Sequence, residues 1–560
     1  MQTRFRIQTI LAAALLLALA SCSKTNKQGR YAPKDAAIVM HIDGASLSSK
    51  LPWEEIKQNA LFQEMYADTS VPAFAKKVLD NPDNSGIDTK TDLLFFAQRD
   101  SLGGIVALTG TVKDAEKFRQ FWIDATEGGS ENEKDGVKFI SKAPVCVGWN
   151  KEKFVVISDV PELGMHRWSG AMDNAGSSLK SRDLMKTCKD VFDLKESNSL
   201  GDDAKFTELV KKPGDLHFWM NSEALNKNNT LNPALAMLNL AELYKGAFTT
   251  AAVNFENGKI SVDAKSYAGK ELSALYKKYG GKDIDEDMIK RLPSKDVAAV
   301  FAMSFKPEGI KEFLKLLGVE GYANMGLAFA GFSLDDFIKA NKGDIMIALT
   351  GLTQKTKTDS IGGKEIKDET VQPDLIFASS IADKDAFNLL IKAGEKFGKD
   401  IPSSVPVAYN SNGKLFAIGN SKENIDKYFA GSNNNYDFLS KISGKPFGAY
   451  VNVQYILKAL EKNLTADSAA KVVYEASLKT WDNVYMKGGE YEDGGITQTA
   501  EINFMDKNTN SLKQLNQYTG LVGKVALEEK KKHQEEIVKE PEVITYPPLS
   551  ALGDSAKKHK

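Results

Sequence analysis

The stretch PVCVGWNKEKFVVISDVPEL, residues 144–163, holds two short apolar runs separated by the polar residues 150–152. Runs rich in Val, Ile and aromatic residues are typical of β-strands, and Asn with charged residues between such runs is typical of a turn. Strands joined by so short a turn must pair antiparallel, because a parallel pair needs a long crossover connection. The stretch therefore predicts a β-hairpin that leads into a helix.

A second hairpin of this kind lies further along the chain. The stretch PVAYNSNGKLFAIGNSKENI, residues 406–425, aligns with the first without a gap. Four more pairs of segments match in the same order, and they begin at Pro33 and Pro293, Ile105 and Leu375, Gly214 and Lys445, and Ala247 and Val484. Each match is weak, but five in one order predict two divergent repeat halves, residues 33–282 and 289–525.

Helices are predicted between some of the strands. After Val112, apolar residues recur at helical spacing from Ala115 to Ala125, with charged residues between them. Short antiparallel hairpins with interspersed helices predict an α+β fold, in which each half is a mainly antiparallel sheet with helices packed on it. The sequence leaves open whether the two halves form one extended sheet or two separate domains.

The N-terminal residues 1–21 have the layout of a secretory signal peptide: Arg4 and Arg6, then an apolar block at residues 10–20. Eleven apolar residues are too few for a membrane span, which needs roughly 20. The order Leu19-Ala20-Ser21-Cys22 resembles the lipobox of bacterial lipoproteins. This resemblance implies that Cys22 is acylated and anchors the protein, with more than one acyl chain making attachment effectively permanent. Residues 22–32 then form a polar tether.

The resemblance to lipoproteins also bears on location. In such proteins an acidic cluster after the cysteine accompanies surface export, whereas Ser23, Lys24 and Lys27 stand here. We therefore expect an outer-membrane lipoprotein that faces the periplasm. Without the signal peptide the chain carries 71 basic and 74 acidic residues, so its charge gives no reason to expect nucleic acid as a partner.

The chain has three cysteines. Apart from Cys22, Cys146 lies in a strand-like run and Cys188 in a helix-like run. The sequence favours two separate buried thiols over a disulfide, although both outcomes remain open because spacing alone does not place their Cα atoms within bonding range.

Searches for catalytic or metal-binding motifs identify no site. No two of the five histidines have metal-ligand spacing on a helix, and H-E-x-x-H, G-x-S-x-G and the phosphate-binding glycine motifs do not occur; the histidines are His41, His166, His217, His533 and His559. His41 and His217 occupy comparable strand-like runs and are expected to be core or surface residues. Residues 177–180 match S-x-x-K, but no K-T-G accompanies them. We predict no catalytic residue, no cofactor and no metal.

Acidic pairs and apolar segments have structural interpretations. Asp202-Asp203 and Asp335-Asp336 precede helical residues and are predicted to cap helices. The segments 232–248 and 322–338 are apolar on nearly every face, which favours burial, with a groove for a hydrophobic ligand as the alternative. Residues 526–560 are predicted to form a charged helix extension and a flexible tail.

The lipobox, the opening APKDAAIVMHIDGASL from Ala32, the repeated hairpins and the length together resemble a lipoprotein family of Bacteroidota that contains a domain of unknown function. This resemblance implies location and fold, and no activity. We expect a non-catalytic binding or scaffold protein of the envelope. Two alternatives remain: a carrier or chaperone for a hydrophobic ligand, and an envelope hydrolase without a recognised motif.

Overall fold

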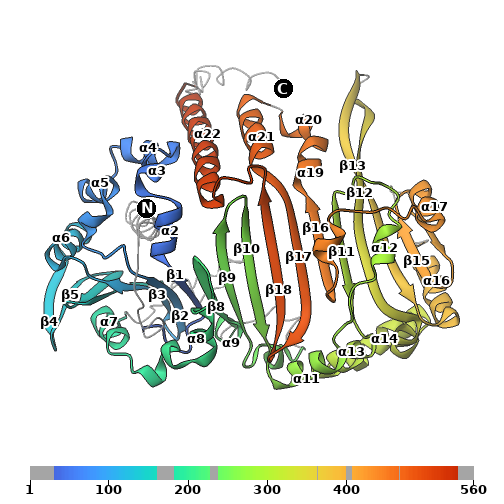
Figure 1. The fold of residues 1–560 in the computed structure, drawn as a ribbon, viewed down its shortest axis with the longest axis horizontal. Coiled ribbons are helices and arrows are strands. Elements are labelled where there is room, and N and C mark those ends of the chain that lie inside the picture. The colour runs from blue at the N-terminus through green and yellow to red at the C-terminus, as the bar shows by residue number, and fades with distance from the viewer. Residues whose placement is uncertain are drawn as a thin grey trace, which may run out of the picture.

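The computed structural model describes residues 31–160, 182–226, 238–361, 364–398, 407–465 and 467–539. Within these residues the strands form one 18-stranded sheet with helices around it (Figure 1). All the strand pairs described are antiparallel. The α+β fold and its antiparallel sheet are confirmed.

The strands of residues 38–267 make one part of the sheet. They are β1 (Ile38–Ile42), β2 (Leu93–Asp100), β3 (Gly103–Thr111), β4 (Ser130–Lys134), β5 (Val137–Lys142), β6 (Val145–Trp149), β7 (Lys153–Asp159), β8 (Leu216–Asn221), β9 (Phe248–Glu256) and β10 (Lys259–Tyr267). Their spatial order is β4-β5-β6-β7-β3-β2-β1-β8-β9-β10. We call this series the first part. The predicted hairpin at 144–163 is β6 and β7.

The strands of residues 299–504 make the second part. They are β11 (Ala299–Ser304), β12 (Asn341–Ile361), β13 (Lys364–Ile381), β14 (Ala408–Ser411), β15 (Leu415–Gly419), β16 (Phe447–Asn452), β17 (Trp481–Glu492) and β18 (Gly495–Phe504). Their spatial order is β14-β15-β13-β12-β11-β16-β17-β18. Because β10 pairs with β18 along its whole length, the two parts form one continuous sheet.

The same connectivity occurs in both parts. With β4 and β5 set aside, the first part runs β6-β7-β3-β2-β1-β8-β9-β10, and each strand has a counterpart at the same place in the second part. All five matched pairs of sequence segments fall on such counterparts. An origin of the two parts as divergent repeats, and the limits at 33–282 and 289–525, stay predictions.

Helices connect and cover the strands. Those of the first part are α2 (Gly44–Lys50), α3 (Trp53–Lys57), α4 (Ala60–Ala67), α5 (Ala73–Asp80), α6 (Ala115–Ala125), α7 (Leu184–Phe192), α8 (Ala204–Leu209), α9 (Ser222–Asn226), α10 (Leu240–Tyr244) and α11 (Lys270–Tyr279), with short 3-10 turns at Pro82–Ser85, Glu196–Asn198 and Leu200–Asp202. The helix predicted after Val112 is α6, and it begins at Asp114, whose carboxylate accepts hydrogen bonds from two backbone N–H groups of the first turn.

The helices from residue 286 onward complete the fold. They are α12 (Glu286–Lys290), α13 (Glu308–Leu316), α14 (Glu320–Ala330), α15 (Leu334–Ala340), α16 (Lys384–Gly398), α17 (Lys422–Ala430), α18 (Leu439–Ile442), α19 (Val453–Ala459), α20 (Glu461–Leu464), α21 (Ser468–Thr480) and α22 (Ser511–Lys539). The charged residues 526–539 belong to the longer α22, which rises beside α21 at the top of Figure 1, and the tail predicted beyond them lies outside the described residues. None of the described helices is long and apolar enough to cross a membrane.

One acid of each predicted pair takes part in a helix cap, Asp203 and Asp336. Asp203 accepts hydrogen bonds from two backbone N–H groups at the start of α8. Ser333 and Asp336 form a reciprocal capping box at the start of α15. Asp202 lies in a 3-10 turn, and its carboxylate is 3.0 Å from Lys34 Nζ.

Candidate functional site

Two histidines that lie 176 residues apart in sequence meet inside the sheet. His41 on β1 lies directly opposite His217 on β8, and their Nδ1 atoms are 3.0 Å apart. His217 Nε2 is 2.9 Å from the carbonyl oxygen of Lys212, and His41 Nε2 is 3.5 Å from a carboxylate oxygen of Asp92. Because a carbonyl only accepts, His217 donates to it through Nε2, so neutral His217 accepts at Nδ1 from His41.

The environment of this pair favours neutral His217. Burial lowers the pKa of His217 below its ordinary value, and the neighbouring His41 acts in the same direction, against the opposing effects of the Lys212 carbonyl, Asp43 and Asp92. Both side chains are almost fully buried. The expectation that His41 and His217 are core or surface residues holds, although the two form a pair.

We predict that acid weakens the fold through His217. Below about pH 6.5 the unfolded chain takes up a proton that the folded protein resists, so the unfolding free energy falls with pH by at most about 1.4 kcal/mol per unit from this group. Urea unfolding between about pH 7.5 and pH 5 measures the slope, which should flatten in His217→Gln and persist in the control His533→Gln on exposed α22. Equal slopes in all three proteins would contradict the assignment.

A buried carboxylate lies two residues before His217. Asp215 is fully buried, and its two oxygens accept hydrogen bonds from Phe255 N at 2.6 Å, Ser46 Oγ at 2.5 Å and Lys50 Nζ at 2.6 and 2.7 Å. This network ties α2 to the start of β8 and to β9. The Ser46 hydroxyl therefore serves Asp215, and the neighbouring histidine pair is almost fully buried.

The remaining predicted site residues fall into three groups. Cys22, His166, His559 and residues 177–180 lie outside the described residues. His533 is exposed on α22, and Cys146 and Cys188 are buried free thiols. Across the part of the chain that the structure describes, no three His, Cys, Asp or Glu side chains gather in a way that suits a metal ion.

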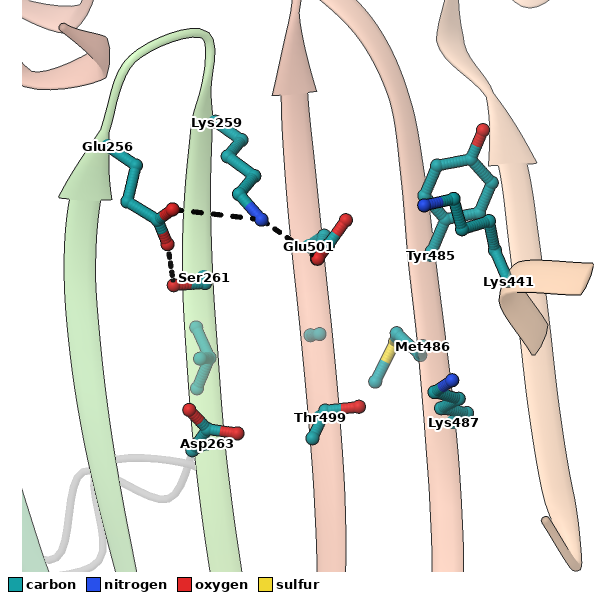
Figure 2. A pocket seen from close by; sticks show the side chains of 12 residues that line it. Glu256, Lys259, Ser261, Asp263, Lys441, Tyr485, Met486, Lys487, Thr499 and Glu501 are labelled. Atoms are coloured by element: carbon teal, nitrogen blue, oxygen red, sulfur yellow. Dashed lines mark hydrogen bonds and ion pairs between the residues drawn. The ribbon is translucent and has the colours of Figure 1, made fainter. Parts of the chain in front are cut away.

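One face of the sheet carries a polar hollow where β10 meets β18. It has a volume of about 380 Å³, and Figure 2 shows the charged side chains that line it. Lys259 Nζ lies 3.0 Å from a Glu501 oxygen and 3.7 Å from a Glu256 oxygen, and Ser261 donates a hydrogen bond to Glu256. The charges at this seam thus neutralise one another, which gives the hollow no clear preference for a charged ligand.

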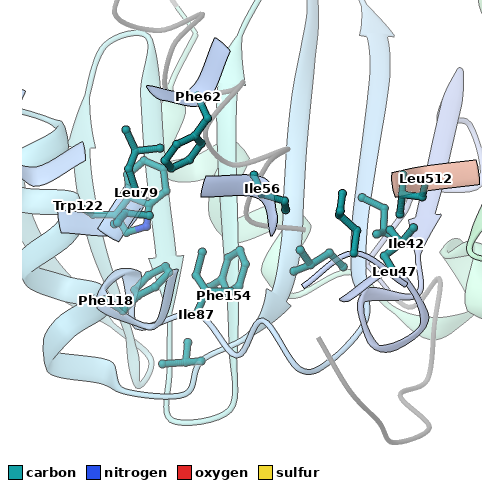
Figure 3. Packing of buried hydrophobic residues seen from close by; sticks show 14 of the residues in the cluster. Ile42, Leu47, Ile56, Phe62, Leu79, Ile87, Phe118, Trp122, Phe154 and Leu512 are labelled. Carbon is teal, nitrogen blue, oxygen red and sulfur yellow. The ribbon is translucent and has the colours of Figure 1, made fainter. Parts of the chain in front are cut away.

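The opposite face is covered by helices in the first part of the sheet. Figure 3 shows Phe62, Leu79, Phe118 and Trp122 from α4, α5 and α6 packing near Phe154 of β7. Helices on a sheet bury one apolar stripe each, and these side chains are all nearly inaccessible to solvent. In the first part this face is a closed core.

The same face is open in the second part. A row of register partners crosses it from Ile418 through Phe377, Ile347, Phe301 and Ala449 to Met486, about 24 Å at roughly 4.8 Å per strand. Ile347 is 48% exposed and the neighbouring Leu375 45%. We call the six residues of this row, together with Leu375, the open apolar face.

The register shows that the open and the covered faces are one side of the sheet. Met486 lies opposite Ala500, which lies opposite Val262, and Val262 packs against the helix-covered core. The segment α13–α15 follows β11 as α2–α5 follow β1. It contacts α11 and α16, and Figure 1 shows α13 and α14 along the lower edge of the sheet. These helices therefore leave the central row uncovered.

Helix α14 corrects a prediction. Residues 322–338 were expected to be buried, but α14 contains no buried residue, and Tyr322, Met325 and Phe329 are 55%, 55% and 76% exposed. Spaced three and four positions apart, they lie on one side of the helix. The sequence shows that these residues are apolar, but it does not show which surface packs against them. Of the other apolar segment, residues 232–237 lie outside the described residues, and the prediction of burial is wrong for residues 238–248, none of which is buried.

Comparison with known proteins gives one family and a distant structural overlap. The family model described as Domain of unknown function (DUF4836) matches residues 30–376, more than half of the 560 residues. No curated protein matches the chain.

Among solved structures, crystal forms I and III of TP0453 overlay with TM-scores of 0.24 and 0.25 at 12% and 13% identity, each covering 44% of this chain and 81% of that one. Crystal form IV has a TM-score of 0.24 at 12% identity and covers 42% and 80%. Overlaps at these scores carry no argument about fold or function.

Proposed function

The chain belongs to the DUF4836 family, and we propose that it is a lipid-anchored binding protein of the outer membrane that holds an amphipathic helix of an envelope protein on its open apolar face. The observation that carries this proposal is the exposure of Ile347 and Leu375 in the middle of a six-strand apolar row. Contiguous exposed apolar surface of this kind marks interaction sites in soluble domains.

The first part of the sheet supports a helix as the occupant. There, the same side of the sheet is covered by helices that bury Phe118 and Trp122. A helix is about 10–12 Å across with its side chains, so the row of about 24 Å leaves room for one beside α16. Helix-in-groove binding with apolar residues at every third or fourth position is a common recognition mode.

The proposed anchor supports an envelope partner. Tyr31 lies nine positions after Cys22, a reach of at most about 30 Å. One edge of the sheet contains the register pairs Ile38–Met220, Thr249–Ser266 and Ile496–Tyr491. The end of β11 that leads to α13 lies at the same edge. The chain therefore enters the fold at the edge that carries α14, and the proposed anchor at Cys22 would keep that edge within reach of the membrane.

Site-specific photo-crosslinking tests the proposal. A photoreactive phenylalanine analogue replaces Ile347 or Leu375 in the native membrane-held protein, and Leu521 on α22, which is 38% exposed, serves as the control position. We expect one envelope protein attached at both test positions through an amphipathic helical peptide, and absent at Leu521.

A charged residue in the apolar row should disrupt binding of the partner. Ile347→Asp should lower the crosslink yield from Leu375 by at least about tenfold, because an unpaired buried carboxylate costs more than about 1.4 kcal/mol. Leu521→Asp should leave the yield unchanged, and thermal unfolding of each variant checks that the fold persists. Attachment to phospholipid alone would favour an acyl-chain carrier instead, and attachment to a second copy of the chain or to nothing would overturn the proposal.

A further inference from the structure

The two buried cysteines meet where α7 packs on the sheet. Cys146 on β6 and Cys188 on α7 are both inaccessible to solvent and belong to one apolar cluster. Cys188 Sγ lies 3.6 Å from the carbonyl oxygen of Val155, and Val155 is the register partner of Gly148, two residues along β6 from Cys146. Helix α7 packs against both strands of this hairpin, β6 and β7.

Gly148 permits this close approach. A Cβ atom at position 148 would lie 3.0 Å from Cys188 Sγ and 2.9 Å from the Phe139 ring. Any larger residue would push α7 away from β6 close to Cys146. The helix and the strand therefore approach each other closely beside Cys146, which is the proximity that a bond between the two thiols requires.

We infer that Cys146 and Cys188 form a disulfide that fastens α7 to β6 when the chain folds in an oxidising compartment. The oxidant is a disulfide-bearing thiol reagent or protein. The Cys146 thiolate attacks one sulfur of that disulfide and releases a thiolate, which takes up the proton that Cys146 lost. Deprotonated Cys188 then attacks Cys146 Sγ in the mixed disulfide and releases the second thiol. Two electrons pass to the oxidant, which leaves as two thiols.

The bond must form before α7 docks. In the folded core the neighbouring Cys146, together with burial, raises the pKa of the Cys188 thiol well above its ordinary value. A buried thiol of this kind is a poor nucleophile and no oxidant reaches it. Once formed, the bond is shielded in the same way, so reductants reach it only after local opening of α7.

Refolding in a glutathione redox buffer tests the inference. The full-length Cys22→Ala protein leaves only two thiols. After refolding, non-reducing peptide mapping should find Cys146 joined to Cys188, with neither thiol open to alkylation in denaturant. Because the buffer supplies the oxidant, the result does not depend on where the protein resides or on the proposed partner.

The thermal midpoint provides the second readout. The oxidised protein should unfold at least about 3 °C above its reduced form, because the bond restricts the unfolded chain between the two cysteines. The variant lacking both thiols, Cys146→Ala with Cys188→Ala, should match the reduced form and ignore the buffer. Free thiols after refolding, or an oxidised form that melts no higher than the reduced one, would overturn the inference.

Discussion

Replacing Cys22 by alanine is expected to move the protein from the membrane fraction to the soluble fraction and to abolish its labelling by fatty acid. Each buried methylene of an acyl chain contributes about 0.8 kcal/mol, so two or more chains account for effectively irreversible attachment. Among the described helices none can span a bilayer, and the mature sequence has nearly balanced charge.

The matched controls for the anchor are the two other cysteines. Cys146→Ala and Cys188→Ala remove buried thiols and should leave both labelling and membrane fractionation unchanged. Metabolic labelling with palmitate followed by carbonate extraction of membranes measures both properties. A Cys22→Ala protein that stays labelled and membrane-bound would refute the anchor, and the proposed location would lose its main support.

The second large effect concerns stability. Phe118→Ala on α6 is expected to lower the unfolding free energy by about 3–5 kcal/mol, because a fully buried aromatic side chain leaves a cavity when it is truncated. Its ring has no exposed surface, and it contacts the rings of Trp149 and Phe154 with centroids 5.7 and 5.2 Å away. Urea denaturation followed by fluorescence measures the change.

The same substitution on α14 is the control. Phe329 is 76% exposed, so Phe329→Ala should change the unfolding free energy by less than about 0.5 kcal/mol. This contrast separates the two apolar helices: α6 uses its aromatic residues to hold the sheet together, whereas α14 presents them to solvent. Similar losses in both variants would show that α14 is part of the core.

Local patterns in the sequence predicted much of the fold. The hairpin at 144–163, the amphipathic helix α6 and the caps at Asp203 and Asp336 all follow from interactions within a few residues of one another. Interactions between residues that are close in sequence can be predicted without knowing which distant segments pack together. The order of the five matched segment pairs likewise anticipated which strands occupy corresponding places in the sheet.

Long-range contacts were harder to predict. The pairing of β10 with β18 joins residues more than 200 positions apart, and the network around Asp215 draws on Ser46, Lys50 and Phe255. Neither has a local signature. The apolar pattern of α14 predicts burial because apolar surface is more stable when it is removed from water. The pattern does not show whether the surface that buries it belongs to the same chain.

The hydrogen-bond ladder between β10 and β18 determines how force passes from one part of the sheet to the other. Its register pairs run without interruption from Lys259–Asn503 to Tyr267–Gly495, so no hinge separates the two parts. A force along these strands loads the whole row of hydrogen bonds in shear, so that they must fail together rather than unzip one by one. A tether on the first part and a partner bound on the second part would thus be coupled through one rigid sheet. The orientation of the partner relative to the bilayer would then follow the orientation of the sheet.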